Sequence, residues 1–187
     1  MESERYLRSN INPNDELDGG LITIDMYHSI VHEKRLFNLT HSNATLADNG
    51  YLTLGIIIPT DWEIHLFNIS MFGVDVPFLA EIYPFCTFTP GSTNLTPVNH
   101  YQRVDLNAPS LVTFNTDPTG FVTGGKRSYS YFGGGSGVGG ANSSGIFQTS
   151  GEWVLHEGKH LIRIQNLTGG PTLVQMALNW YEVNHYA

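Results

Sequence analysis

Proline and glycine interrupt much of this chain of 187 residues, and a long helix has little room to form where they do. The sequence contains nine prolines and 20 glycines, and Pro84, Pro90, Pro97, Pro109 and Pro118 punctuate its middle, where they leave little room for a long amphipathic helix. Between the breakers the apolar residues alternate, as in Leu21 to Tyr27, where Ile22, Ile24 and Met26 share one face. The sequence therefore predicts a protein built from short strands.

The same alternation predicts about eight to ten strands in all. The clearest cover residues 21–27, 51–58, 62–70, 76–83, 152–155, 160–167 and 172–180. Asp48-Asn49-Gly50 predicts a hairpin, because Asn and Gly both tolerate the positive φ of a type I′ turn. Pro59-Thr60-Asp61 separates two strands, and the glycine-rich residues 124–145 predict a flexible loop between strands.

The length fits one domain, and 41% hydrophobic residues suffice for a packed core. Many short strands with Gly- and Pro-rich turns predict an all-β fold, an antiparallel β-sandwich, and jelly rolls are the common form at this size. We expect this single domain to span residues 21–187. Residues 1–20 are polar, contain Pro13 and end in Gly19-Gly20, so we expect an extended N-terminal arm there.

Only 14% of the residues are charged, and the net charge is −8. That balance disfavours nucleic acid and anionic membrane surfaces as partners. The longest aliphatic run, Ile56 to Ile58, is stopped by Pro59 and is far shorter than a membrane span. The polar N-terminus predicts no signal peptide. The single cysteine, Cys86, excludes an intrachain disulfide and is expected to be a small buried thiol.

His156-Glu157-Gly158-Lys159-His160 matches the zinc-protease pattern H-E-x-x-H. That chemistry needs a helix, because only there do both imidazoles reach one metal with the glutamate beside them. Here strand-like residues precede and follow the motif, and Gly158 lies where a turn belongs. We expect a hairpin turn with two incidental histidines.

The glycine-rich run Gly135 to Gly140 matches the dinucleotide pattern G-x-G-x-x-G. The residues that follow it cannot start the helix whose N-terminus would bind the pyrophosphate. We also find no Gly-x-Ser-x-Gly elbow and no recognisable carboxylate pair. The sequence predicts no catalytic residues, no metal site and no cofactor, so a hydrolase is the least favoured class.

The C-terminal third contains the most specific sequence pattern, an ordered series of four short motifs. They are Glu152-Trp153-Val154-Leu155, Leu161-Ile162-Arg163-Ile164, Asn166-Leu167-Thr168-Gly169 and Trp180-Tyr181-Glu182. Further pieces precede them, at residues 31–37, 59–65, 81–83, 90–93, 99–103 and 117–119 and in the glycine-rich loop. Over roughly residues 21–182 the chain resembles the capsid decoration proteins of tailed phages, also called cement or head-stabilising proteins.

The sequence departs from that group in two places. The turn after the Glu-Trp strand is usually closer to Lys-x-Asn-Thr, whereas this chain has His156-Glu157-Gly158-Lys159. The arm, Met1 to Gly20, has no counterpart in the group. The resemblance implies a β-sandwich or jelly roll, a homotrimer, and the major capsid protein as partner. It places the protein on the outer capsid surface of the virion after synthesis in the host cytoplasm.

Two sets of residues are candidate contacts with the capsid or with a neighbouring subunit. The first belongs to the arm and comprises Tyr6, Leu7, Arg8, Ile11 and Leu17. The second, Tyr129, Tyr131 and Phe132, precedes the glycine-rich loop. A disordered tail explains the arm equally well, and half-buried strand aromatics explain the second set equally well.

The alternative function is a carbohydrate-binding β-sandwich of a phage head or tail fibre, used in host adsorption. Trp62, Trp153 and Trp180 are available to stack on sugars. All three lie in alternating strands, however, which favours packing in the core or at strand ends over an exposed platform.

Overall fold

The computed structural model describes residues 35–73, 77–100, 109–123, 129–133, 147–148 and 152–184. For residues 72–73, 129–133 and 147–148 it describes the backbone alone. The predicted arm (1–20), the predicted strand at 21–27 and most of the glycine-rich region lie outside the described residues.

The described residues form fourteen strands, more than the eight to ten expected. They are β1 (Leu36–Leu46), β2 (Tyr51–Ile58), β3 (Trp62–Gly73), β4 (Phe78–Tyr83), β5 (Thr87–Thr89), β6 (Thr93–Leu95), β7 (Val98–Asn99), β8 (Thr113–Thr116), β9 (Thr119–Val122), β10 (Tyr129–Gly133), β11 (Phe147–Gln148), β12 (Trp153–Leu155), β13 (Gly158–Asn166) and β14 (Thr172–Asn184). The expected count was too low because strands of two or three residues are too short to show an alternating pattern.

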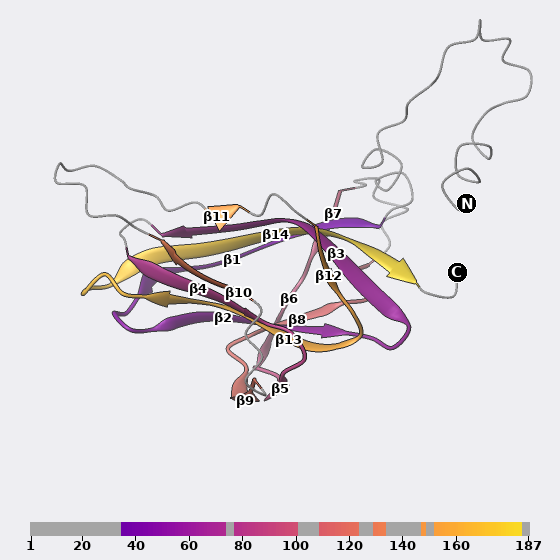
Figure 1. Cartoon of the computed structure of the whole chain (residues 1–187), viewed down its shortest axis with the longest axis horizontal. Helices are drawn as coiled ribbons and strands as arrows, with labels where there is room; N and C mark the ends of the chain where they lie inside the picture. The colour runs from indigo at the N-terminus through magenta and orange to yellow at the C-terminus, as the bar shows by residue number, and fades with distance from the viewer. Residues whose placement is uncertain are drawn as a thin grey trace, which may run out of the picture.

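Two antiparallel sheets form the body of the protein (Figure 1). Sheet A has the order β11-β3-β14-β1-β7, with β12 also paired to β3, and sheet B has the order β10-β4-β13-β2-β8-β6. A separate two-stranded sheet, β5–β9, lies on the outer side of sheet B, away from sheet A (Figure 1). The predicted all-β, antiparallel sandwich is thus confirmed.

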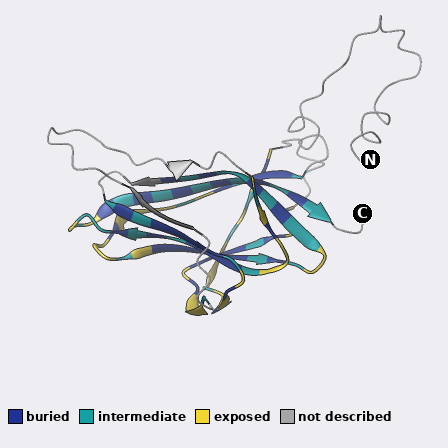
Figure 2. Cartoon of the chain, in the orientation of Figure 1, coloured by how far each residue is buried: buried dark blue, intermediate teal, exposed yellow. Residues whose placement is uncertain are grey.

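The buried residues lie on strands of both sheets (Figure 2), and residues from both sheets form one hydrophobic core cluster. Along β14, every even-numbered residue from Thr172 to Glu182 is buried, which is the period of two expected for a strand with one face inward. The largest fully buried side chains are aromatic, and the Trp180 ring lies between Phe37 and Phe114 at centroid distances of 5.8 Å and 4.8 Å. The inward faces therefore account for the apolar half of each alternating pattern.

A β-bulge in β3 changes which residues of that strand face the core. Leu66 pairs with Trp180 and Asn68 pairs with Asn179, so Phe67 is the extra residue. Before the bulge the buried residues are the even-numbered Ile64 and Leu66, whereas after it they are the odd-numbered Ile69 and Met71. Without the bulge, half of β3 would present its polar residues to the core.

The turn predicted as a hairpin at residues 48–50 instead carries the chain from one sheet to the other. Asp48-Asn49-Gly50 joins β1 of sheet A to β2 of sheet B, and these strands do not pair. Asn49 has a φ of 58°, as expected, but Gly50 does not adopt a positive φ, so the turn is not type I′. The break at Pro59 to Asp61 is confirmed, and it also passes between the sheets, with Asp61 at a φ of 69°.

Candidate functional site

The H-E-x-x-H motif lies on a turn and a strand, with no helix. His156 and Glu157 follow β12, and Gly158, Lys159 and His160 begin β13. The expected hairpin is wrong, because β12 pairs with β3 in sheet A whereas β13 pairs with β2 and β4 in sheet B. Short turns of this kind look alike in sequence whether they join paired strands or strands of opposite sheets.

The two histidines of the motif have different environments. His160 is fully buried, its Nε2–H donates to the His156 carbonyl at 2.8 Å, and its Nδ1 accepts from the Phe85 N–H at 3.4 Å. Burial lowers the pKa of His160. The exposed His156 instead places Nδ1 3.0 Å from Glu63 Oε2. In the part of the chain that the structure describes, no three His, Cys, Asp or Glu side chains are arranged to hold a metal ion.

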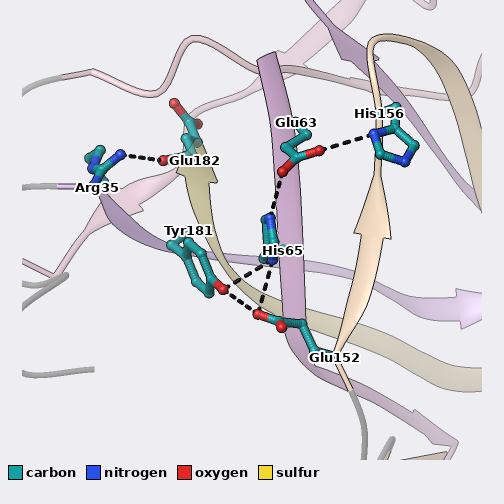
Figure 3. Close-up of polar contacts among 7 residues, drawn as sticks. All are labelled: Arg35, Glu63, His65, Glu152, His156, Tyr181 and Glu182. Carbon is teal, nitrogen blue, oxygen red and sulfur yellow. Dashed lines mark hydrogen bonds and ion pairs between the residues drawn. The ribbon is translucent and has the colours of Figure 1, made fainter. Parts of the chain in front are cut away.

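A polar cluster occupies the outer face of sheet A where β12 meets β3 (Figure 3). This sheet A cluster consists of Glu63, His65, Glu152, His156 and Tyr181. Glu63 and His65 lie two apart on β3 and so share a face, and Tyr181 of β14 is the direct cross-strand partner of His65. The cluster lies beside the β3 bulge.

His65 lies at the centre of the sheet A cluster (Figure 3). Its Nε2 is 2.9 Å from Glu63 Oε1, and its Nδ1 is 3.1 Å from Glu152 Oε1 and 3.0 Å from the Tyr181 hydroxyl. The Tyr181 hydroxyl also donates to Glu152, and its ring stacks on the His65 ring with centroids 4.6 Å apart. The carboxylates of Glu63 and Glu152 each contact a histidine of the cluster. The cluster therefore ties the β12 edge to the sheet.

A buried carboxylate lies beneath the end of β14. Glu182 accepts from Ser110 Oγ at 2.5 Å, from the Leu111 N–H at 3.1 Å and from Trp180 Nε1 at 3.3 Å. Arg35 donates through a terminal nitrogen to the Glu182 backbone carbonyl, at 3.3 Å (Figure 3). The carboxylate therefore holds the segment before β8 against sheet A.

The outer face of sheet B carries a cation between aromatic rings, which we call the Arg163 cage. Arg163 donates through Nε to Glu81 at 2.6 Å and through a terminal nitrogen to the Tyr83 hydroxyl at 2.9 Å. Its guanidinium lies 4.7 Å from the Tyr51 ring centre, 5.0 Å from that of Tyr83 and 5.4 Å from that of Phe121. Tyr51 and Phe121 are exposed, so the cage opens to solvent on one side.

The β5–β9 sheet is anchored on this face by a small apolar cluster. Tyr83, Cys86, Phe88 and Leu161 are all buried there. An ideal Cβ on Gly55 would lie 2.8 Å from the Phe88 ring, so the ring packs directly on the backbone of β2. The expectation of a small buried thiol at Cys86 is confirmed, and burial raises the pKa of that thiol.

Several large apolar side chains remain exposed around the β5–β9 sheet. Phe85, just before β5, is 57% exposed, and Phe121 and Val122 of β9 are 38% and 63% exposed. All four residues of β9 are exposed (Figure 2). The sequence does not distinguish these residues from core residues. Two or three apolar side chains between breakers give the same sequence pattern whether they face the core or solvent.

The structure places only part of the predicted contact set. Tyr6, Leu7, Arg8, Ile11 and Leu17 lie outside the described residues. Tyr129, Tyr131 and Phe132 lie on β10, at one end of the strand order of sheet B, where they pair with Ile82, Ala80 and Leu79 of β4.

The three tryptophans pack as expected. Trp180 is fully buried, and Trp62 and Trp153, each at an end of its strand, pack against the core. They do not form an exposed platform. The described residues contain no helix that is long and apolar enough to cross a membrane.

Comparison with known proteins adds no relative: no family model, no curated protein and no solved structure matches this chain.

Proposed function

We propose that this protein is a structural virion protein that decorates and stabilises the capsid of a tailed phage. It binds the outer surface of the major capsid protein shell as a homotrimer and has no enzymatic role. The observation that carries the proposal is the concentration of exposed apolar side chains at the β5–β9 sheet, namely Phe85, Phe121 and Val122. Exposed apolar side chains gathered on one surface are typical of an interaction site.

The strand order supports a jelly roll, the fold that the resemblance to decoration proteins implies. The first four strands alternate between sheets A and B, and so do the last two, β13 and β14. The central strands of sheet A are β3, β14 and β1, and those of sheet B are β4, β13 and β2, so chain-terminal and early strands lie side by side. Greek-key connections produce interleaving of this kind, so the strand order supports the proposed jelly roll.

A decoration protein acts through the area of its contacts with the capsid and through the number of copies that bind. It must hold neighbouring capsid subunits together against the pressure of packaged DNA, which requires contacts but no reactive group. A trimer at a capsid threefold axis engages three sites at once, so a modest affinity per subunit becomes a large avidity. A body tied together by buried carboxylates at Glu81 and Glu182 suits such a load.

Cryo-electron microscopy of the intact virion tests the proposal most directly. We expect density for this chain on the outer capsid surface in a fixed ratio to the major capsid protein. Light scattering of the isolated protein at micromolar concentration should give the mass of a trimer. Virions without the chain on their heads would overturn the decoration role, and a monomer throughout that range would overturn the trimer.

Carbohydrate binding is the second candidate, and the Arg163 cage favours it. Tyr51 and Phe121 present exposed rings next to a fixed cation, and exposed rings can stack on pyranose faces. A glycan array distinguishes the two functions: binding that is lost in Tyr51→Ala supports adsorption to carbohydrate. If the protein binds no glycan on the array, carbohydrate binding is excluded as its function.

A further inference from the structure

Phe85 has a backbone conformation that its side chain disfavours. Its φ is 54°, in the left-handed region. Among the described residues, the other non-glycine positions with positive φ are Asn49, Asp61 and Asp117. Asn and Asp adopt this region readily, because their short polar side chains bond locally, whereas a bulky aromatic residue gains no such compensation. Phe85 is therefore a strained position.

The surroundings of Phe85 hold it in this conformation. Its N–H donates to Nδ1 of the buried His160 at 3.4 Å, and the next residue, Cys86, donates its N–H to the Lys159 carbonyl at 2.9 Å. Tyr83 and Cys86, on either side of the Pro84-Phe85 pair, are both buried. The segment is thus fixed at both ends, and the ring between them is turned outward.

The strain does not serve to bury the ring. Phe85 is 57% exposed, and its contact with the His160 ring is tilted, at a centroid distance of 5.2 Å. An exposed aromatic side chain on a strained backbone lowers the stability of the isolated protein twice, through strain and through lost burial. Strained positions of this kind gather at functional sites, because another requirement maintains them.

We propose that Phe85 is an aromatic anchor that inserts into an apolar pocket on the outer surface of the major capsid protein. This inference rests on the proposed function and names the contact. Aromatic residues that become fully buried on binding dominate the energy of protein interfaces. The Phe85 ring lies near Gly158, since an ideal Cβ there would be 4.0 Å from Phe85 Cδ1, and the 57% of the residue that is exposed is accessible to a partner.

Charges near Phe85 indicate what rims the pocket. Glu157 precedes Gly158 and is exposed, and its Oε2 accepts from the N–H of the exposed Asp61 at 3.0 Å. These two acidic residues lie on the loops near Phe85, and the nearby Lys159 ammonium is bound by the Phe88 carbonyl at 2.9 Å. We expect the partner pocket to be apolar at its floor and to have basic side chains or backbone N–H groups at its rim.

The test compares three variants of the full chain in co-sedimentation with purified phage heads that lack the protein. Phe85→Asn removes the ring and suits the backbone, Phe85→Tyr keeps the ring, and Val98→Ser removes a side chain that is also apolar and is 50% exposed but lies on β7 of sheet A. We expect Phe85→Asn to weaken head binding by about tenfold or more, and the other two to stay within about twofold of wild type. Denaturant unfolding of Phe85→Asn should occur at the wild-type midpoint or above it.

The outcomes separate the anchor from the proposed function. Wild-type protein that binds no heads overturns the decoration role itself. Wild-type binding that Phe85→Asn leaves intact overturns the anchor alone, as does an equal loss in Val98→Ser. A lowered unfolding midpoint in Phe85→Asn would show that the ring supports the fold, and a trimer that dissociates in this variant would assign Phe85 to the subunit interface. Either result also overturns the anchor.

Discussion

Arg163 of β13 donates to Glu81 of β4 across 2.6 Å, and the side chain of this carboxylate is only 3% exposed. Glu81 also accepts from the Tyr83 hydroxyl at 2.8 Å, so two donors compensate its burial. The pair joins neighbouring strands of sheet B directly beside the β5–β9 sheet. It couples the stability of the sandwich to the surface that we propose binds the capsid.

Removing Arg163 should therefore cost more than an exposed ion pair would. We expect Arg163→Ala to lower the free energy of unfolding by about 3 kcal/mol, because Glu81 would keep its charge without its main partner. Urea unfolding followed by tryptophan fluorescence measures the loss. The double variant Arg163→Met with Glu81→Gln removes both charges, and a loss equal to that of Arg163→Ala would contradict the explanation.

Trp180 should be the most costly core residue to truncate. It is fully buried between Phe37 and Phe114, so Trp180→Ala leaves a large cavity and is expected to cost about 3–5 kcal/mol. Trp153→Ala is the matched control, since Trp153 is only partly buried at the edge of the core. Thermal unfolding of both variants compares them, and an equal cost would show that the core is not centred on Trp180.

Stability should fall as the pH is lowered from neutral. Burial lowers the pKa of His160 and of His41 below the ordinary value of 6.5, so the unfolded chain binds protons at a pH where the folded chain does not. The contribution of both groups is present above pH 6.5 and is lost as the pH falls toward their folded pKa values. Unfolding midpoints in urea between pH 7.5 and 5 measure this effect.

The variant His160→Gln measures how much of the pH dependence of stability comes from His160. Protonation of His160 would remove the acceptor at Nδ1 that binds the Phe85 N–H, so this site contributes directly. We expect the variant to be less stable at neutral pH but to lose less stability on acidification. A slope as steep as that of wild type would show that other groups carry the pH dependence.

The thiol of Cys86 should react slowly in the folded protein. It is buried, and the raised pKa leaves less of the reactive thiolate. We expect labelling with a disulfide reagent at pH 8 to be at least about tenfold slower in buffer than in guanidinium. Labelling at the same rate in both conditions would contradict the buried position.

Zinc should not stabilise the protein. Both ring nitrogens of His160 are engaged, one by the His156 carbonyl and one by the Phe85 N–H, so this ring cannot turn toward a metal without breaking two hydrogen bonds. We expect no shift of the melting temperature with equimolar zinc chloride. A rise that disappears in His156→Ala would restore the metal interpretation.

The strands that matter most were predictable because their patterns are long. Residues 51–58 and 172–180 alternate or stay apolar over enough positions to fix both the strand and its inward face, and β2 and β14 follow them. The pairing of these strands was not predictable. Turns such as Asp48 to Gly50 contain the residues of a hairpin, yet they connect different sheets, because local chemistry fixes a turn but not which strand lies beside the next.

The exposed surface at the β5–β9 sheet likewise could be predicted from the sequence only in part. Exposed Phe121 and buried Phe88 occupy similar short strands, and only the packing of Phe88 on Gly55 separates their roles. His65 likewise meets Glu152 and Tyr181 through a sheet assembled from distant segments.

The sequence by itself determined the class of the protein, since frequent breakers and a period of two exclude long helices and require sheets with one apolar face. The tertiary structure alone decided which strands became neighbours, which carboxylates were buried with a partner, and which apolar rings stayed outside. The physical reason is that alternation is a local property of the backbone, whereas burial and charge pairing depend on contacts between residues far apart in the chain.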